Sequence, residues 1–383
     1  MGDRQVAHMD LDTFFVSVER LENSSLFGKP VIIGGFSDRG VVASCSYEAR
    51  RFGVHSAMPG KLARRLCPQA IWIRGDMDKY SRYSHTVTEI IEEAAPLVEK
   101  ASVDEHYIDV SGLDKFFGTQ RWMHQLRARI IAETGLPISF GLSVNKTVSK
   151  IATGEAKPNG EKMVQQGLVQ PFLYPLSIKK IPGIGEKSYH TLRDMGIVYI
   201  ETLANMPQEL LSKVMGENGK NIWEKANGID GRPVEPYHEQ KSIGAERTFE
   251  IDTTDMKFLQ QMLGKMVQDI CFDMRKQSKL CATVTVKIRY SDFQTHTLQK
   301  RVPYTAYDHV ILNAAKELLT KVYDRRLLVR LIGVKVSNLV HGSQQIDLFE
   351  DSEELVKLYQ ALDTIKFWYG KDAVGRGGRT QRK

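Results

Sequence analysis

The chain has 383 residues, of which 42% are hydrophobic and 26% charged, so it is globular and long enough for about two to four domains. No stretch resembles a membrane span, the start of the chain lacks the apolar run of a signal peptide, and the four cysteines form no CxxC pair. We therefore expect a protein of the reducing cytoplasm. The net charge of +7 divides into −3 over residues 1–110, +4 over 111–242 and +6 over 243–341, which permits a polyanionic partner without requiring one.

The first motif is MDLDTFF at residues 9–15, which follows apolar residues and precedes a helical pattern that continues to Leu21. The pattern predicts a short strand running into a helix, with Asp10 where the strand ends. Both Asp10 and Asp12 have an ordinary alternative role, because acidic residues commonly cap helix N-termini, and the N-cap interpretation favours Asp12.

Two short strands are predicted at residues 30–34 and 40–44, and SYEARRFG follows at 46–53. Tyr47 and Arg50 are one helical turn apart, so they share a face and can offer a phosphate one hydroxyl and one guanidinium. The start of an ordinary amphipathic helix is the alternative interpretation.

Two adjacent carboxylates, Asp104 and Glu105, lie in the strand-prone segment SVDEHYIDV at residues 102–110. Burying ionised carboxylates there requires cations or strong donors, and a divalent metal would supply the charge. Neighbouring side chains of a flat strand point to opposite faces, so the two acids can share an ion only if the chain bends. A hairpin tip with two solvated acids is the alternative.

Residues 71–165 alternate strand and helix patterns, with a strand at 138–144 and a helix at 145–155. The helix stops at AKPNG, residues 156–160, where proline and glycine enforce a turn that fixes Lys157. A lysine held in this way can neutralise a phosphate, although most lysines are simply solvated.

Together these motifs, MDLDTFF, SYEARRFG, SVDEHYIDV and AKPNG, occur in the order found in the Y family of translesion DNA polymerases, and the chain resembles the bacterial DNA polymerase IV branch of that family. The resemblance implies an α+β multidomain fold, a right-hand polymerase with a ferredoxin-like palm, small fingers, a helical thumb and a little finger. We expect the palm at residues 1–17 and 71–165 and the fingers at 18–70.

The resemblance also implies the chemistry of the site, which is phosphoryl transfer supported by two Mg²⁺ ions. It assigns the catalytic, metal-binding role to Asp10, Asp104 and Glu105, with the Leu11 carbonyl as a further ligand. Phe15 would exclude a 2′ hydroxyl by collision, with an ordinary core phenylalanine as the alternative, and the neighbouring Phe14 is expected to be a core phenylalanine. The implied nucleotide-binding set is Phe14, Phe15, Ser44, Tyr47, Arg50 and Lys157. Low fidelity and lesion tolerance follow from the resemblance alone.

The segment IPGIGEK, residues 181–187, lies between helical patterns and resembles a helix-hairpin-helix within a thumb at 166–230. Gly183 and Gly185 would let the backbone approach a DNA phosphate, next to the positive end of the following helix and Lys187. A plain turn between two helices is the alternative. Residues 231–242 contain two prolines and no periodicity, which is typical of a linker.

Residues 243–341 predict a β-α-β-β-α-β domain that resembles the little finger of the family. The expected strands are 243–251, 281–290, 293–302 and 328–339, and the expected helices are 256–277 and 306–323. In the second strand apolar residues alternate with polar ones, so one sheet face can pack on helices while Lys287 and Arg289 on the other bind DNA.

The tail at residues 342–383 contains QIDLF, residues 345–349, which is similar to the pentapeptide that docks bacterial polymerases on the sliding clamp. Gln345, Leu348 and Phe349 would make these contacts, because an exposed Leu-Phe pair needs a partner groove. The pentapeptide folding back on its own domain is the alternative.

We expect a monomeric DNA-directed DNA polymerase whose partners are primer–template DNA, deoxynucleoside triphosphates and the clamp, without a membrane. A nucleotidyl cyclase also uses paired carboxylates and two metals, but it needs neither the hairpin nor the basic second domain. A non-catalytic DNA-binding scaffold is the other rival, and the retained carboxylates argue against it.

Overall fold

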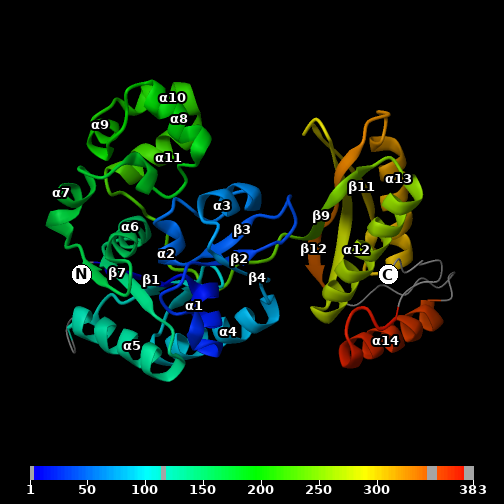
Figure 1. Ribbon diagram of the computed structural model, residues 1–383, viewed down its shortest axis with the longest axis horizontal. Coiled ribbons are helices and arrows are strands. Elements are labelled where there is room, and N and C mark those ends of the chain that lie inside the picture. Colours follow the sequence, from blue (N-terminus) through cyan, green and yellow to red (C-terminus); the bar gives the residue numbers. More distant parts are fainter. Residues whose placement is uncertain (1–3, 114–117, 343–351, 375–383) are drawn as a thin grey trace. The chain divides into compact units, whose positions relative to one another are not determined.

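The computed structural model describes residues 4–113, 118–342 and 352–374, and it divides into two compact units, Met1–His238 and Glu239–Lys383 (Figure 1). Each unit has its own sheet and hydrophobic core. Over the described residues, no helix combines the length and the apolar character that a membrane span requires.

The larger sheet of the first unit has the strand order β5-β6-β1-β7-β8. Its central strand β1 (Val6–Leu11) pairs antiparallel with β6 (Glu105–Asp109) and with β7 (Ile138–Ser143). The outer strands are β5 (Val98–Lys100) and β8 (Glu161–Met163). Because β1 lies in the middle, both of its edges are hydrogen-bonded to neighbouring strands.

One face of this sheet packs on α1 (Phe14–Glu22), α4 (Met77–Ala94) and α5 (Thr119–Thr134). These helices cover every second residue of β1, as the two-residue period of a strand requires. The residues of β1 in this core are Ala7, Met9 and Leu11.

The opposite face of the sheet packs on α6 (Lys146–Ala156). Contact is closest at Gly141 of β7, where a Cβ would come within 2.2 Å of the Ser149 carbonyl oxygen. Glycine is therefore required at this position for the helix to approach the strand. The even-numbered residues His8 and Asp10 belong to this second face.

A smaller sheet, in the order β3-β2-β4, contains β2 (Val31–Gly34), β3 (Val42–Cys45) and β4 (Ile71–Ile73). It carries α2 (Tyr47–Arg50) and α3 (Gly60–Leu66). β4, which we expected at the start of the palm, pairs in parallel with β2 in this sheet. The smaller sheet and its helices share a separate core, which consists of Ile32, Val42, Cys45, Ala49, Val54, Met58, Ala63 and Cys67.

Short helices follow over the residues expected to form the thumb, and they share one core. They are α7 (Val169–Leu173), α8 (Glu186–Asp194), α9 (Ile200–Ala204), α10 (Gln208–Met215) and α11 (Glu217–Ala226). Single 3₁₀ turns occur at Ser24–Leu26, Gln166–Leu168 and Ile178–Lys180.

The first half of the expected linker belongs to the first unit. Val234 is 4% exposed and packs with Val6 and Tyr107. The amide of Glu235 donates to a Glu99 carboxylate oxygen at 2.7 Å. The lack of periodicity in the sequence therefore predicted the irregular backbone of this segment. It could not predict that the segment packs against the first unit.

The second unit has the predicted β-α-β-β-α-β order. Its antiparallel sheet, in the order β11-β10-β12-β9, packs on two helices and buries Ala282, Val284, Val286, Ile288 and Tyr290 of β10, as the alternation indicated. The elements are β9 (Ser242–Thr253), α12 (Met256–Lys276), β10 (Lys279–Tyr290), β11 (Thr295–Thr305), α13 (Asp308–Val322) and β12 (Val329–His341). A last helix, α14 (Ser352–Tyr369), pairs Asp363 with Arg275 of α12.

Candidate active site

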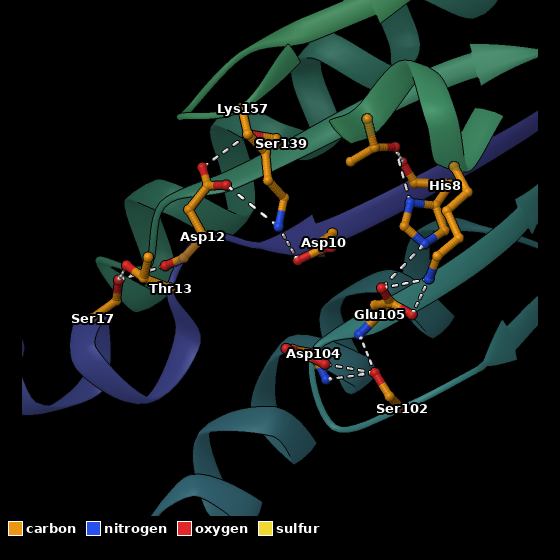
Figure 2. A network of polar contacts seen from close by, with 12 residues as sticks. His8, Asp10, Asp12, Thr13, Ser17, Ser102, Asp104, Glu105, Ser139 and Lys157 are labelled. Carbon is orange, nitrogen blue, oxygen red and sulfur yellow. Dashed lines mark hydrogen bonds and ion pairs between the residues drawn. The ribbon is translucent and has the colours of Figure 1, made fainter. Parts of the chain in front are cut away.

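The acidic motifs meet where β1 and β6 pair. Asp10 lies directly opposite Glu105 in the antiparallel register, and the Leu11 amide donates to the Asp104 carbonyl oxygen at 3.0 Å. Directly opposed residues of an antiparallel pair have side chains on the same face. Figure 2 shows Asp10 between the Lys157–Asp12 pair and the Asp104–Glu105 segment. Acids separated by more than 90 residues in the sequence thus come together at one end of the sheet.

A bend interrupts the chain directly before the second of the adjacent acids. β6 begins at Glu105, and Asp104 lies in the bend that precedes it. The Ser102 hydroxyl oxygen accepts bonds from the amides of Glu105 at 3.0 Å and Asp104 at 3.3 Å, and it donates to Asp104 Oδ1 at 2.6 Å. Ser102 was missed as a site residue, although a serine two positions before an acid is a recognisable turn signal. The acids do lie at a hairpin tip, but both are partly buried.

Each of the two paired acids has a lysine beside it. Lys157 Nζ lies 2.5 Å from Asp10 Oδ1, so Lys157 is not a freely solvated lysine. Lys150 of α6 donates to both carboxylate oxygens of Glu105 at 2.6 Å. Lys150 was not predicted, because only the packing of α6 on the sheet brings it to β6.

Charge at this end of the sheet is unevenly balanced. Burial raises the pKa of Asp10; Lys157 opposes the rise, and Glu105 and Asp104 add to it. His8 and Lys150, against the effect of burial, hold the pKa of Glu105 at about 2. His8 Nε2 is 3.9 Å from Glu105, too far for a hydrogen bond, so we regard Lys150 as the main partner of Glu105.

His8 supports the site from within the sheet. It is 1% exposed, and its Nδ1 lies 2.9 Å from the Thr153 hydroxyl of α6. Burial lowers the pKa of His8. A neutral ring at this position leaves the charge of Glu105 to be balanced by Lys150 and by any cation that the carboxylates bind.

Asp12 does not cap α1, so the N-cap interpretation was wrong. Thr13 precedes the helix in a left-handed conformation and makes no side-chain cap bond. The Asp12 carboxylate instead accepts a bond from the Ser139 hydroxyl at 2.8 Å and one from the Asn159 amide at 2.6 Å. Its strongest partners come from distant parts of the chain, and local sequence rules do not detect such partners.

A pocket of about 160 Å³ opens beside the acids. It brings together residues that the motifs assigned to the metals and to the nucleotide, from β1, α1, the smaller sheet, α2 and the 157–160 turn. The predicted residues that line it are Asp10, Leu11, Phe14, Phe15, Ser44, Arg50, Asp104 and Lys157. Thr13, Ala43 and Ser56 also line it and were not predicted.

Tyr47 lies beside this pocket on α2. The Arg50 guanidinium lies 5.0 Å from the centre of the Tyr47 ring, as their shared helical face predicted. Burial raises the pKa of the Tyr47 hydroxyl, and the Asp12 carboxylate adds to the rise, so the hydroxyl remains a proton donor. Tyr47 and Arg50 can therefore both donate hydrogen bonds to an anion.

The two phenylalanines differ in their surroundings. Phe14 is 3% exposed and belongs to the core, as expected, although it also reaches the pocket. Phe15 is partly exposed and stacks on Tyr80, with ring centroids 4.2 Å apart and 13° between the planes. Tyr80 was not predicted, because its ring comes from α4.

The donor set fits Mg²⁺, because Asp10, Asp104, Glu105 and the Leu11 carbonyl all offer oxygen atoms. Among the residues that the structure describes, no three acidic, histidine or cysteine side chains are grouped closely enough to hold a metal ion. Burial is the main cause of the raised pKa of Asp10, and Glu105 and Asp104 add to it, so a bound cation would stabilise the ionised carboxylate.

The predicted DNA contacts of the first unit, Gly183, Gly185 and Lys187, do not line this pocket. Gly183 has φ of 102°, and Gly185 precedes α8 without a side-chain cap, so amides at the start of this helix are free of a capping side chain. Lys187 is exposed. In the second unit Lys287 pairs with Glu246, and Arg289 donates to the Thr295 hydroxyl at 2.8 Å.

The proposed clamp residues Gln345, Leu348 and Phe349 lie outside the described residues. All four cysteines are described, and they are buried and free.

Comparisons with known proteins extend over the whole chain. A model of the impB/mucB/samB family matches residues 9–154, and a model of that family's C-terminal domain matches residues 240–348. DNA polymerase IV of Dehalococcoides mccartyi is 40% identical over 386 aligned positions, which cover 100% of this chain and 99% of that protein. DNA polymerase IV of Methanoculleus marisnigri is 39% identical and covers 89% of this chain and 96% of its own length.

Among solved structures, a chimeric Y-family DNA polymerase superposes with a TM-score of 0.80. It is 28% identical to this chain and covers 88% of it, while the match spans 100% of the chimera.

Proposed function

The chain belongs to the DNA polymerase IV group of the Y family of translesion DNA polymerases, and from that premise we propose how its residues extend a primer. It is a DNA-directed DNA polymerase that uses primer–template DNA and nucleoside triphosphates, and its fold is that of divalent-metal-dependent polymerases. The cyclase and scaffold alternatives find no support in relatives that match the full chain.

We assign the metal-binding role to the acids at the β1–β6 end. Two Mg²⁺ ions, when bound, would offset the charge on the attacking primer oxygen and on the leaving pyrophosphate. Asp10, Asp104 and the Leu11 carbonyl would hold the ion on the nucleotide side, and Glu105 would serve the ion beside the primer hydroxyl. The single observation that carries this proposal is the register of Asp10 opposite Glu105, with Leu11 bonded to the backbone of Asp104.

We assign triphosphate binding to cationic and hydroxyl groups around the pocket. Arg50 of α2 and Lys157 of the 157–160 turn both line the pocket, and Tyr47 lies beside Arg50. Charge-assisted bonds from a guanidinium and an ammonium are the strong contacts that a triphosphate receives in proteins. Ser44 would add a neutral donor, and Phe15 would contact the sugar.

Substitution of Asp104 by alanine tests the catalytic assignment. We expect primer extension with Mg²⁺ to fall by more than about 100-fold, because loss of a direct ligand should exceed the 10- to 100-fold cost of losing a group behind it. Binding of primer–template DNA, measured by fluorescence anisotropy, should persist.

Asp109→Ala is the matched control, because Asp109 lies at the far end of the same strand and bonds the Ser111 amide. It should leave primer extension near the wild-type rate. Full activity of Asp104→Ala would remove the carboxylate from the mechanism.

We further propose that Gly183, Gly185 and Lys187 contact the DNA backbone, and that Lys287 and Arg289 add contacts from the second unit. The exposed positions of the first three residues support the assignment. Lys287 would have to exchange its partner Glu246 for a phosphate. We also propose a cytoplasmic monomer that binds the sliding clamp through Gln345, Leu348 and Phe349.

A further inference from the structure

The Asp12 carboxylate is a buried junction between segments that are far apart in the sequence. Asp12 is 1% exposed at the end of the segment that joins β1 to α1. Burial of an ionised carboxylate is unfavourable unless donors surround it. Oδ2 accepts from the Ser139 hydroxyl of β7 at 2.8 Å and from the Asn159 amide at 2.6 Å. This oxygen therefore ties β7 and the 157–160 turn to the end of β1.

The other carboxylate oxygen faces the nucleotide-binding groups. Tyr47 of α2 places its hydroxyl 3.4 Å from Oδ1, at the long end of the hydrogen-bond range, and Lys157 Nζ lies 3.8 Å from the same oxygen. Figure 2 shows Ser139 and Lys157 on the same side of Asp12, each facing one of its carboxylate oxygens. Asp12 does not line the pocket, whereas Asp10 and Lys157 do.

We infer that Asp12 is a positioning residue, which sets the distance between Tyr47 on α2 and Lys157 on the 157–160 turn before a triphosphate enters. The inference rests on the proposed triphosphate-binding roles of these two residues. α2 has only four residues, and the 157–160 turn is bonded to β7 through Gly160 and to Arg127 through Asn159, so Asp12 is the side chain that contacts both segments. A carboxylate held by two short bonds on the palm side gives both groups a fixed reference point.

Substitution by asparagine separates the two sides of this junction. The asparagine carbonyl oxygen can take the place of Oδ2 and keep both bonds from Ser139 and Asn159. Its amide group then faces Lys157 and Tyr47, where it offers donors in place of an acceptor. Asp12→Asn thus preserves the contacts that support the fold and reverses the contact that faces the nucleotide.

Steady-state insertion of single deoxynucleotides measures the effect. In Asp12→Asn we expect KM for the nucleotide to rise by about tenfold, the usual cost of losing a hydrogen bond to a charged group, with kcat changed much less. The Kd for primer–template DNA should stay the same. An unchanged nucleotide KM in a folded Asp12→Asn protein would overturn the inference.

A double-mutant cycle tests whether Asp12 acts through Tyr47. Tyr47→Phe alone should raise the nucleotide KM, and the double variant should cost less than the product of the two single effects, because coupled residues are not additive. Effects that multiply would show that Asp12 does not act through the Tyr47 hydroxyl. If Tyr47→Phe and Lys157→Ala both keep the wild-type KM, the proposed triphosphate roles fail, whatever Asp12 does.

Two further variants separate positioning from stability. Thr88→Ala removes a buried partner of His106 elsewhere in the first unit and should lower Tm without changing the nucleotide KM. Ser139→Ala keeps the carboxylate, removes one of its donors, and should raise KM by about threefold, as expected for one hydrogen bond. A KM increase in Thr88→Ala of the same size as in Asp12→Asn would assign the effect to stability alone.

Discussion

At the scale of single residues, the Phe15 ring is supported from behind. It stacks on Tyr80, which is completely buried, and the Tyr80 hydroxyl donates to Glu19 at 2.7 Å. Glu19 follows Phe15 by one turn of α1, and it also accepts from Lys79 at 2.9 Å. α1 therefore holds Tyr80 by both its ring and its hydroxyl, and Tyr80 in turn restricts the movement of the Phe15 ring.

Phe15→Ala should relax selection against ribonucleotides. A rigid ring rejects an added 2′ hydroxyl by collision, and removing the ring removes the collision. We expect the ratio of ribonucleotide to deoxynucleotide incorporation to rise by at least about tenfold, which corresponds to roughly 1.4 kcal/mol of lost discrimination. Insertion of each nucleotide opposite the same template base measures this ratio.

A control for this substitution must leave the pocket unchanged. Because Phe14 also lines the pocket, Val18→Ala in the buried face of the same helix is the control for stability, and it should lower Tm while sugar selection is retained. If Phe15→Ala selects deoxynucleotides as strictly as the wild type, Phe15 does not exclude the hydroxyl.

The acidic pair and Asp12 mark the limit of what the sequence predicts about the site. The bend at Asp104 was predictable, because two adjacent acids can share a face only where a strand is interrupted. The contacts of Asp12 were not predictable, because Ser139 and Asn159 lie more than 120 residues away and join it only through packing. Local rules offered a helix cap for Asp12, and the fold used the carboxylate elsewhere.

At the scale of elements, the segment 230–238 fastens the start of α6 to the sheet. The Asp230 carboxylate accepts from the Thr147 amide at 3.1 Å and from its hydroxyl at 2.7 Å, where the positive end of the helix dipole favours an anion. Arg232 pairs with the same carboxylate at 2.7 Å. α6 carries Lys150 to Glu105, so this fastening also positions the candidate active site.

Asp230→Asn should destabilise the first unit in a pH-dependent manner. Burial opposes the effect, but Arg232 and Thr147 hold the pKa of Asp230 at about 2, below its usual 3.8. A depressed carboxyl pKa contributes stability that is complete above about pH 4 and is lost as the pH falls through about 2. We expect a loss of about 1–2 kcal/mol at pH 7, reduced from the full shift because Arg232 is solvent-exposed.

Thermal unfolding of the first unit at pH 7, 4 and 2.5 measures this loss. The difference between wild type and Asp230→Asn should be constant from pH 7 to about 4 and should shrink at lower pH. Asp109→Asn, which alters another carboxylate of the same unit, should not reproduce this pH profile. A difference that grows on acidification would contradict the assignment of the low pKa to Asp230.

The helices and strands illustrate why some elements were easier to predict than others. The alternation from Ala282 to Tyr290 is complete, so β10 and its buried face were predicted correctly. The three-residue strand β4 shows no such pattern, and its pairing with β2 depends on residues 40 positions away. Residues 231–238 were predicted to be a linker because their sequence has no hydrophobic periodicity. An irregular segment that packs on a domain lacks periodicity in the same way as a free linker does.

At the scale of the whole molecule, the net positive charge increases along the sequence as far as residue 341, while the candidate active site with its acids lies in the first unit. The segment 243–341 carries +6, and its sheet presents Lys287 and Arg289 on the face opposite α12 and α13. We therefore expect the second unit to contribute cationic contacts to DNA, and the acids of the first unit to bind the divalent cations.

The pentapeptide at residues 345–349 should connect the polymerase to the sliding clamp, and its removal should leave the second unit folded. α14, which follows the pentapeptide, is anchored independently, because Asp363 bonds Arg275 at 2.6 and 2.8 Å and Tyr359 is 4% exposed. Deletion of residues 345–349, or Leu348→Ala combined with Phe349→Ala, should weaken clamp binding by at least about tenfold, since apolar anchors dominate such contacts.

Surface plasmon resonance with immobilised clamp measures the binding. Primer extension on a short primed template without clamp checks that the variants keep their polymerase activity. Gln344→Ala, immediately before the pentapeptide, should bind the clamp as the wild type does. If the pentapeptide instead folds back on its own domain, the deletion should lower the Tm of the second unit and leave clamp affinity unchanged. Undiminished clamp binding by the deletion variant would therefore exclude the docking role, because binding that survives the deletion does not depend on these five residues.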